Sequence, residues 1–284
     1  MRPLTFFHTA EPNIALFDGL MKEVAPEIPL RHVLEPEPLA RAIAAGKVTR
    51  EVALFTEERV LAALAEQPAV LVCTCSTIGG VIDHMAHPRV PLLRIDRPMA
   101  EKAVRAGSRV LIAACVESTV GPTRELVDEA GWRRHQRLQF SSQVIRIFDA
   151  WPLFQAGDRA GYWARIAERI REASAGFDAV VLAQASMAGA ADLLGDLGIP
   201  VFSSPRVGAV EMADFWRRWT ARKRDWVDGL VDVLDTIPEA DKDARSVVRM
   251  AICLGEQLER PVEEAGPRRV RFEFEEYDKL PGQW

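Results

Sequence analysis

The stretch AVLVCTCSTIGG, residues 69–80, decides the fold that we predict for this chain. It begins as an apolar run and ends in two cysteines, hydroxyl residues and a pair of glycines. A short apolar run bounded by turn signals is typical of a strand buried in a parallel sheet. A second stretch, AVVLAQASMAGA at residues 179–190, has the same character but contains no cysteine.

The loops of these two stretches, CSTIGG and QASMAG, align without a gap. Thr77 falls on Ser186, and Cys75 falls on Gln184. We interpret the match as a weak internal repeat of one unit, a strand followed by a loop and a helix. The sequence therefore predicts two lobes that each contain this unit once.

Apolar and amphipathic segments alternate on both sides of the quoted stretches. The predicted strands lie within residues 3–9, 30–36, 69–77, 91–96, 108–116, 137–148, 178–186 and 200–204. The predicted helices lie within residues 14–26, 39–46, 49–67, 99–107, 121–131, 159–176 and 188–198. Strands that alternate with helices indicate βαβ units and mostly parallel sheets.

The predicted fold class is therefore α/β, with two pseudo-symmetric three-layer lobes and a mainly helical C-terminal extension. We place the first lobe, with Cys75, at residues 1–98 and the second lobe, with Gln184, at residues 99–205. A return segment and the extension occupy residues 206–284.

The extension carries an unusual set of aromatic residues. A helix is predicted over residues 214–234, with Trp216, Trp219, Trp226, Leu230 and Val233 near one face. A second helix over residues 243–258 and an edge-like strand over residues 268–278 are predicted to follow. The tryptophans need a partner surface, and two interpretations stay open. The helix packs on the chain's own lobes, or it forms the contact of a homodimer.

Composition argues against some classes of binding partner and indicates the cellular compartment. A net charge of −5 gives no basic footprint for nucleic acid. No apolar stretch approaches the ~18 residues of a membrane span, and the start MRPLTFFHTAEPN lacks the apolar core of a secretory signal. Four cysteines in 284 residues do not make a disulfide framework. We therefore expect a reduced, cytoplasmic protein without a nucleic-acid or membrane partner.

Ligands in open α/β sheets bind beyond the carboxyl ends of the strands, so residues just after each strand are the first candidates. Cys75 fits best, because it stands at a strand end and at a predicted helix start. The helix dipole and free backbone N–H groups would favour the thiolate there and lower the thiol pKa. The same loop, with Ser76 and Thr77, can bind a carboxylate. Cys75 is thus either a nucleophile or base, or a small structural residue.

Other polar residues at strand ends also leave two interpretations each. Ser118 and Thr119 either cap a helix or form a second carboxylate-binding hydroxyl loop. His8 is either an acid or anion ligand, or a strand-end histidine in solvent. His84 and His87 lie far enough from the Cys75 loop to be surface residues.

The remaining cysteines are weaker candidates. Cys73 lies on the same face of its strand as Cys75, where it packs in the core or supports the site. Cys115 is either core or a second thiol from a neighbouring strand, and Cys253 is expected in the core of the tail helix. No second Cys/His cluster has ligand spacing, so no metal site is expected. Signatures of nucleotide, nicotinamide and zinc-protease sites are also absent.

The ordered set of loops resembles the aspartate/glutamate/hydantoin racemase superfamily. The similarity rests on the Cys-Ser-Thr that begins at Cys75, on RVLIAACVESTVGPTRELVDEAG at residues 109–131 and on DAVVLAQASMAGAADLLGDLGIPVFSSPR at residues 178–206. It covers about residues 1–213. The resemblance implies an enzyme without a cofactor, acting on a small carboxylic acid held between the lobes. In two-base members, one cysteine from each lobe flanks the α-carbon, and the two thiols remove and return a proton.

Carried over by position, the resemblance implies that Cys75 is the first-lobe cysteine. Ser76 and Thr77 match the residues that bind the substrate carboxylate. Thr119, with Ser118 beside it, matches the hydroxyl loop of the second lobe.

The second catalytic loop contains Ser186 and departs from the family at Gln184, which stands where the second cysteine is expected. An amide cannot give or take a proton near neutral pH. It can donate a hydrogen bond to a developing enolate or carboxylate oxygen. Symmetric chemistry with two thiols is therefore not expected.

Three functions remain open on these residues. The first is a cofactor-independent racemase or isomerase that uses the single thiol of Cys75 on a small carboxylic acid. The second is a decarboxylase or other lyase, similar to arylmalonate decarboxylases, although those enzymes keep the second-lobe cysteine. The third is a binding or sensor protein that kept the cleft and lost catalysis. We expect a homodimer in each case.

Overall fold

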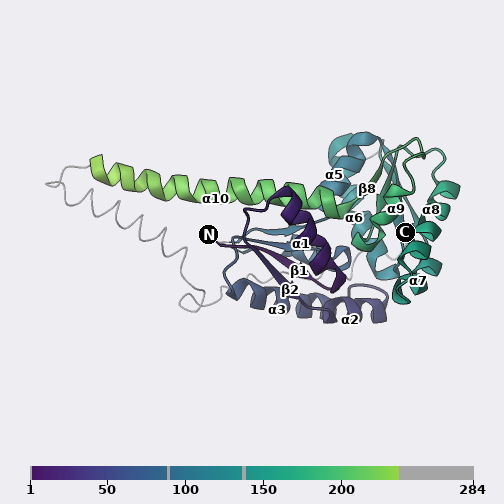
Figure 1. Ribbon diagram of the computed structural model, residues 1–284, viewed down its shortest axis with the longest axis horizontal. Coiled ribbons are helices and arrows are strands. Elements are labelled where there is room, and N and C mark those ends of the chain that lie inside the picture. Colours follow the sequence, from purple (N-terminus) through teal and green to yellow (C-terminus); the bar gives the residue numbers. More distant parts are fainter. Residues whose placement is uncertain (1, 88–89, 136–138, 237–284) are drawn as a thin grey trace.

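The computed structural model describes residues 2–87, 90–135 and 139–236 of the chain. Two α/β lobes lie side by side, and one long helix runs from the second lobe back along the first (Figure 1). The predicted helix over residues 243–258, the predicted strand over residues 268–278 and Cys253 lie outside the described residues.

Each lobe is built on a four-stranded parallel sheet. The first sheet contains, in spatial order, β2 (Leu30–Leu34), β1 (Leu4–His8), β3 (Val70–Cys73) and β4 (Leu92–Arg94). The second contains β6 (Ser141–Arg146), β5 (Arg109–Ala114), β7 (Ala179–Leu182) and β8 (Val201–Ser203). The two orders correspond strand for strand, so β3 and β7, which carry the repeated stretch, occupy the same place. The predicted pair of α/β lobes is confirmed.

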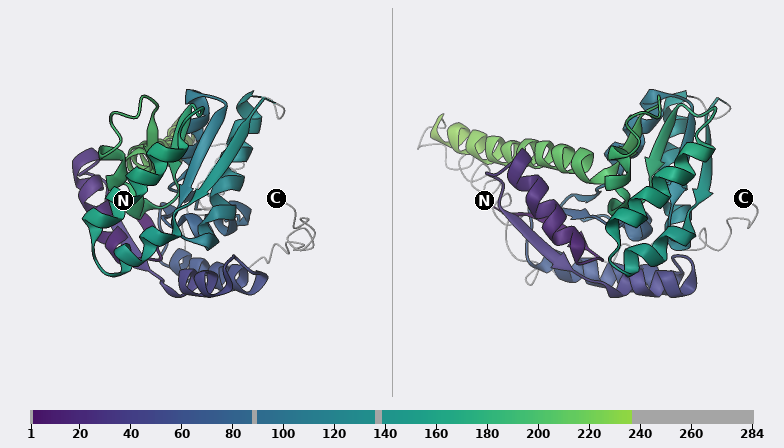
Figure 2. Two further views of the ribbon diagram at one scale, coloured as in Figure 1. Left: turned by 90° about the vertical axis from the view of Figure 1, so that its right-hand side faces the viewer. Right: turned by 45° about the vertical axis from the view of Figure 1, so that its right-hand side comes forward.

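Helices cover both faces of each sheet, as Figure 2 shows. The first lobe contains α1 (Pro12–Val24), α2 (Glu37–Ala45), α3 (Arg50–Ala65) and α4 (Ser76–His84). The second contains α5 (Arg97–Ala106), α6 (Glu117–His135), α7 (Trp151–Gln155), α8 (Arg159–Ala173) and α9 (Gly189–Asp192), with 3-10 turns at Phe148–Ala150 and Ala185–Met187. The chain then enters α10 (Ser204–Thr236).

Side chains of the first sheet alternate between two buried faces, as the pleat of a strand requires. On β1, Leu4 and Phe6 pack with Phe17 of α1 and with α10. Phe7 points the other way and packs with residues of α3 and α4. All four side chains are fully buried, and each burial stabilises the fold by about 1.5–3 kcal/mol.

The second sheet repeats this arrangement with other helices. Val110 and Ile112 of β5 pack against α5 and α6, whereas Leu111 and Ala113 pack against α8 and α9. Because both faces are covered, the central strands β5 and β7 consist of continuous apolar runs rather than alternating ones. This burial explains why residues 69–73 and 179–183 looked alike in the sequence.

The long helix α10 returns to the first lobe and completes its core. Trp216 is 4% exposed, packs among the residues of the first sheet and donates from Nε1 to the backbone oxygen of Arg2 at 3.3 Å. Trp219 packs against the same cluster. For these two tryptophans the first interpretation, packing on the chain's own lobes, is confirmed. The side chain of Trp226 lies outside the described residues, and the homodimer stays a prediction.

Three predicted helix boundaries were wrong. The helix α10 begins at Ser204 rather than at residue 214. The helix α6 begins at Glu117 rather than at Gly121, because an acidic residue in the first turn is favoured by the helix dipole. Ser118 and Thr119 therefore lie in the first turn and not in a preceding loop. The helix expected over residues 188–198 ends at Asp192 and continues as turns, in a segment that contains two glycines and thus has low helix propensity.

The helix α5 spans the predicted boundary between the lobes and packs on the second sheet through Met99 and Ala103. The division into domains stays a prediction. Within the part of the chain that the structure describes, no helix is long and apolar enough to cross a membrane.

The buried indole of Trp216 makes the contribution of α10 measurable. We expect Trp216→Ala to lower the free energy of unfolding by about 3–5 kcal/mol, because it removes a large core side chain and leaves a cavity. Val210→Ala on the same helix is the control, since Val210 is 43% exposed, and it should change stability by less than about 0.5 kcal/mol. Urea unfolding followed by circular dichroism measures both. Equal losses would contradict the packing described for α10.

Candidate functional site

The carboxyl ends of the two sheets border one cavity of about 320 Å³. The first lobe lines it with Thr9, Ala10, Pro12, Asn13, Leu16, Leu39, Ile43, Thr74, Cys75, Ser76 and Thr77. The second lobe lines it with Val116, Thr119, Trp151, Phe154, Arg159, Trp163, Gln184, Ala185, Ser186, Ala188 and Gly189. The cavity thus brings together six of the predicted site residues, namely Cys75, Ser76, Thr77, Thr119, Gln184 and Ser186.

Cys75 stands where β3 ends and α4 begins. It occupies the N-cap position of α4, with an extended backbone of φ −106° and ψ 113°. Its side chain is only 7% exposed. The sulfur accepts hydrogen bonds from the hydroxyls of Thr9 and Thr77 and from the backbone N–H groups of Thr77 and Ile78. The thiol therefore lies among donors at a helix N-terminus, as its place in CSTIGG predicted.

The pKa of Cys75 is shifted in the direction opposite to our prediction. Burial raises it above the ordinary value, and the hydrogen bonds from Thr9, Ile78 and Thr77 lower it only in part. The predicted lowering was wrong, because desolvation of the thiolate outweighs the favourable helix N-terminus. The resting side chain is therefore a thiol at neutral pH.

Gln184 takes the corresponding position in the second lobe. It precedes the 3-10 turn Ala185–Met187 and has an extended backbone of φ −123° and ψ 143°. Its Oε1 accepts a hydrogen bond of 2.7 Å from the backbone N–H of Cys115. Because only the amide oxygen can accept from an N–H group, this contact determines the orientation of the amide. The NH₂ group is left as the donor for a ligand.

Hydroxyl groups of the two lobes meet between α4 and α6. The Oγ1 atoms of Thr77 and Thr119 lie 2.9 Å apart and share a hydrogen bond across the lobes. Because the Thr77 hydroxyl donates to Cys75, the Thr119 hydroxyl is the donor to Thr77 Oγ1. In the second catalytic loop, the Ser186 hydroxyl hydrogen-bonds with that of Tyr162 at 3.0 Å.

Two predicted binding residues do not line the cavity. His8 is fully buried, and its Nδ1 and Nε2 lie 2.8 Å from Thr74 Oγ1 and His32 Nδ1. Neither an anion ligand nor a solvent-exposed histidine fits this placement, because both ring nitrogens are used within the first lobe. Ser118 is 2% exposed, and its Oγ has no hydrogen-bond partner among the described residues. Successive helical residues point about 100° apart, so Thr119 reaches the cavity and Ser118 does not.

The hydrogen bonds of His8 determine its tautomer. Thr74 Oγ1 donates to the backbone oxygen of Phe7 at 3.2 Å, so it accepts from His8 Nδ1–H. His8 Nε2 then accepts from His32 Nδ1–H. Burial, and after it the neighbouring His32, lowers the pKa of His8 to about 3. His8 is therefore neutral near pH 7 and positions Thr74 behind the Cys75 loop.

Cys73 and Cys115 also lie outside the cavity lining, and each is 1% exposed. The thiol of Cys73 donates to the backbone oxygen of Cys75 at 3.5 Å, and burial raises its pKa. Burial also raises the pKa of Cys115 to about 12, although a hydrogen bond from Tyr162 opposes the shift. These positions fit packed cysteines rather than a second thiol facing the ligand.

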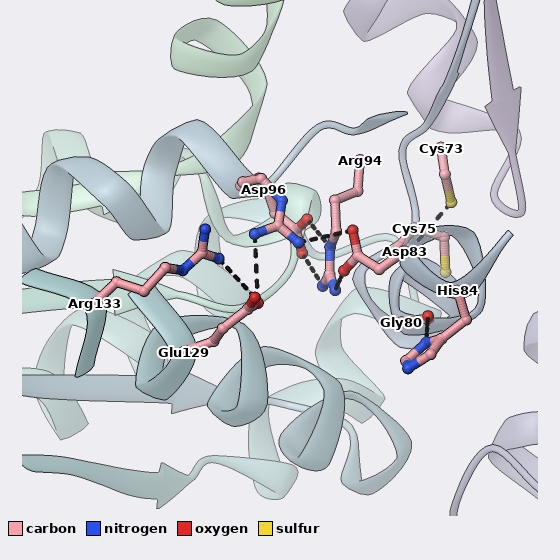
Figure 3. Close-up of polar contacts among 10 residues, drawn as sticks. Cys73, Cys75, Gly80, Asp83, His84, Arg94, Asp96, Glu129 and Arg133 are labelled. Carbon is pink, nitrogen blue, oxygen red and sulfur yellow. Dashed lines mark hydrogen bonds and ion pairs between the residues drawn. The ribbon is translucent and has the colours of Figure 1, made fainter. Parts of the chain in front are cut away.

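A buried ion pair holds the start of α4 in place (Figure 3). Arg94 binds Asp96 through Nε and Nη2 at 2.7 and 2.9 Å, and both side chains are almost fully buried. Burial would raise the pKa of Asp96, but the charge and hydrogen bonds of Arg94 lower it, helped by the Ser76 hydroxyl. A Cβ at Gly79 would lie 2.7 Å from the Arg94 guanidinium carbon, so a larger residue there would displace the guanidinium from its place beside Asp96.

Further ion pairs extend this contact to the neighbouring helices (Figure 3). Asp83 of α4 binds Arg94 at 2.8 Å and Arg97 of α5 at 2.8 Å. Arg97 also approaches Glu129 of α6 at 3.4 Å. The helix that begins after Cys75 is thereby connected to both helices on one face of the second sheet.

Sequence reasoning missed one side of the cavity, which Trp151, Phe154, Arg159 and Trp163 line from α7 and α8. The aromatic cluster WPLFQAGDRAGYW was visible in the sequence. It does not directly follow a predicted strand, so it was not among the candidates expected just after each strand. No group of three or more His, Cys, Asp or Glu side chains that could hold a metal occurs in the described residues.

The neutral, buried His8 makes stability depend on pH. An unfolded histidine has a pKa near 6.5, so below that pH the unfolded chain binds a proton that folded His8 does not bind until about pH 3. Stability should therefore fall as pH drops from 6.5 toward 3, with about 1.4 kcal/mol per pH unit from His8. Urea unfolding at several pH values measures the slope.

The variant His8→Gln should remove that part of the slope, because glutamine does not titrate. Its amide can still donate to Thr74, so this hydrogen bond is kept. Val210→Ala, which replaces an exposed side chain that does not titrate, is the control and should keep the wild-type slope. An unchanged slope in His8→Gln would contradict the assignment.

Loss of the buried carboxylate should destabilise the fold strongly. We expect Asp96→Asn to lower the free energy of unfolding by about 3–5 kcal/mol, because Arg94 would be left buried with a weaker partner. Glu129→Gln removes a half-exposed carboxylate from the same network and should cost less than about 1 kcal/mol. Denaturant titration compares the two variants, and a small loss in Asp96→Asn would contradict the role of the pair.

Comparison with known proteins agrees with this architecture. The sequence profile of the Asp/Glu/Hydantoin racemase family matches residues 15–212. No curated protein sequence matches the chain significantly. Among solved structures, an aspartate racemase from Picrophilus torridus is similar, with a TM-score of 0.60, 14% identity and coverage of 76% of this chain and 94% of that one.

Two other solved structures are similar at the level of the fold. A glutamate racemase from Bacillus anthracis has a TM-score of 0.58 and 12% identity, over 76% of this chain and 82% of that one. An allantoin racemase from Klebsiella pneumoniae has a TM-score of 0.50 and 15% identity, over 78% of this chain and 88% of that one. Because the family profile spans well over half of the sequence, the chain belongs to the Asp/Glu/Hydantoin racemase family.

Proposed function

We propose that the protein is a cofactor-independent enzyme of the isomerase class that moves a proton at the carbon next to the carboxylate of a small acid. Cys75 is its one catalytic thiol. Membership in the racemase family supports the class of reaction, and the neighbouring folds are named as racemases of small molecules. The observation that carries the proposal is the single cavity that Cys75 and Gln184 line from different lobes.

The carboxylate of the substrate is placed at the start of α4. A helix N-terminus offers unpaired backbone N–H groups and a positive dipole end, which favour an anion. The hydroxyl groups of Thr77 and Thr119 add polar atoms at the boundary between the lobes. In this position the α-carbon of the acid comes next to the Cys75 sulfur.

Proton removal begins from the thiolate of Cys75. The sulfur takes the α-proton, and the electrons of the C–H bond move into the carboxylate to give an enediolate. The positive end of the α4 dipole and the NH₂ group of Gln184 stabilise the charge that develops on its oxygens. Cys75 then returns a proton to the same carbon, and the thiolate is restored.

Gln184 makes the two faces of the substrate chemically different. Its amide donates a hydrogen bond but carries no transferable proton near neutral pH. Return of the proton from Cys75 restores the original configuration, whereas inversion needs a proton from water on the face of Gln184. Exchange of the α-proton should therefore be faster than inversion.

A carboxylate-binding protein without catalysis is the second candidate. The raised pKa of the buried Cys75 thiol favours it, because the population of thiolate at neutral pH is small. This candidate keeps the ligand contacts of the cavity and lacks the proton transfer.

The proposal is tested by incubating the full-length protein with single-enantiomer small acids in deuterated water. We expect NMR to show exchange of the α-proton that outpaces the loss of optical rotation. Because burial raises the pKa of Cys75, the exchange rate should rise about tenfold per pH unit from pH 6 to 8 without a plateau. Release of carbon dioxide, which a decarboxylase would produce, is followed in the same samples and is not expected.

Matched cysteine variants identify the catalytic sulfur. Cys75→Ser should lose exchange, because a serine hydroxyl is too weak an acid to act as the proton carrier. Cys73→Ala, which removes the neighbouring thiol outside the cavity, should keep it. Binding of acids without exchange in the wild type would reject the enzyme in favour of the carboxylate-binding protein.

A further inference from the structure

One side of the cavity is an aromatic wall, a term that we use for Trp151, Phe154 and Trp163. The rings of Trp151 and Phe154 are stacked, with centroids 4.9 Å apart and planes inclined by 17°. The indole Nε1 of Trp163 donates to the backbone oxygen of Ser186 at 2.9 Å. The wall is therefore attached to the loop that carries Gln184.

Contacts behind the aromatic wall hold its rings in place. A Cβ at Gly189 would lie 2.5 Å from the Trp163 ring, so glycine lets the indole lie against this backbone. Phe154 is supported by the buried Tyr162, whose ring centroid is 5.2 Å away. A ligand that stacks on rings already held in position loses little conformational entropy in ordering them.

The cavity is too large and too apolar for a carboxylate alone. Its volume of about 320 Å³ corresponds to roughly ten waters at about 30 Å³ each. The first lobe adds apolar side chains to the lining, namely Pro12, Leu16, Leu39 and Ile43. The polar lining residues include Cys75, Thr77 and Gln184. The lining thus offers polar groups for a carboxylate and apolar surface for a further substituent.

The charges of the lining favour an anion without an ammonium group. The only charged side chain among the lining residues is that of Arg159, whose guanidinium carbon lies 5.0 Å from the Phe154 ring centroid. No Asp or Glu of the described residues lines the cavity. The α-ammonium of an amino acid would lose its water there without gaining an acidic partner, which is unfavourable.

We infer that the cavity selects carboxylic acids that lack an α-amino group and carry a flat aromatic substituent, which packs on the aromatic wall. The inference rests on the proposed function for the position of the carboxylate beside Cys75. A ring between the side chains of the wall can adopt the offset-stacked or edge-to-face arrangements that aromatic groups prefer. Phenylacetate has both features and also carries protons on its α-carbon.

The test compares dissociation constants on the full-length protein by NMR titration. The probes are phenylacetate, cyclohexylacetate, acetate and L- and D-glutamate. We expect phenylacetate to bind at least about tenfold more tightly than acetate, and several-fold more tightly than cyclohexylacetate. Glutamate should bind no more tightly than acetate. Equal affinity for phenylacetate and cyclohexylacetate would overturn the preference for a flat ring.

The variant Phe154→Leu keeps an apolar side chain and removes a ring of the wall. It should weaken phenylacetate binding by about fivefold to tenfold and leave acetate binding unchanged. Phe148→Leu is the matched control, because Phe148 is exposed on the adjoining 3-10 turn and does not line the cavity; it should leave both affinities unchanged. If Phe154→Leu weakened both acids equally, its effect would be structural and the inference would fail.

Binding and proton exchange are measured on the same samples. The proposed function and the preference for aromatic acids can then be rejected independently of each other. Selective binding of phenylacetate without exchange, in both the wild type and Cys75→Ser, overturns the proposed function and keeps this inference. Tighter binding and exchange of glutamate overturn this inference and keep the proposed function. Failure of every acid to bind overturns both.

Discussion

The parallel direction of the strands is the constraint on which the rest of the structure depends. In a parallel sheet all strands end at one edge, so the loops that follow them emerge together. Both sheets obey this rule, and their carboxyl edges border the same cavity. Cys75 and Gln184, which are far apart in the sequence, become partners in one site for this reason. The two repeated stretches therefore form equivalent strands of the two sheets, and the residues that follow these strands form the site.

Strand direction alone does not determine where α4 begins relative to the sheet. The buried Arg94–Asp96 pair adds contacts that keep the start of this helix in position. A buried ion pair adds little net stability compared with apolar side chains of the same volume. Its effect here is geometric, because Arg94 lies against Gly79 of α4 and Asp96 interacts with Ser76. The connection through Arg97 to α6 then relates the start of α4 to the second lobe.

The sequence was sufficient for properties that depend on local pattern. The alternation of strands and helices along the chain, the repeated unit and the position of Cys75 at a helix start follow from apolar runs and turn residues. The pKa of Cys75 could not be predicted in the same way, because desolvation depends on atoms from distant segments, including Thr9. The burial of His8 depends equally on a partner, His32, on another strand. The aromatic wall was missed because α7 and α8 carry it, and its residues do not directly follow a predicted strand.

The hydrogen bond from the Cys115 N–H to Gln184 Oε1 makes the two repeated loops chemically different. Two equivalent loops after β3 and β7 would by themselves suggest equivalent chemistry on both faces of a substrate. The backbone donor of Cys115 instead engages the amide oxygen and leaves only the NH₂ group for the ligand. In the proposed function the first lobe therefore exchanges the proton, while the second lobe stabilises charge and, through Trp163 on the neighbouring helix α8, binds an apolar group. A symmetric fold thus carries a chemically asymmetric site, and this asymmetry is why exchange should exceed inversion.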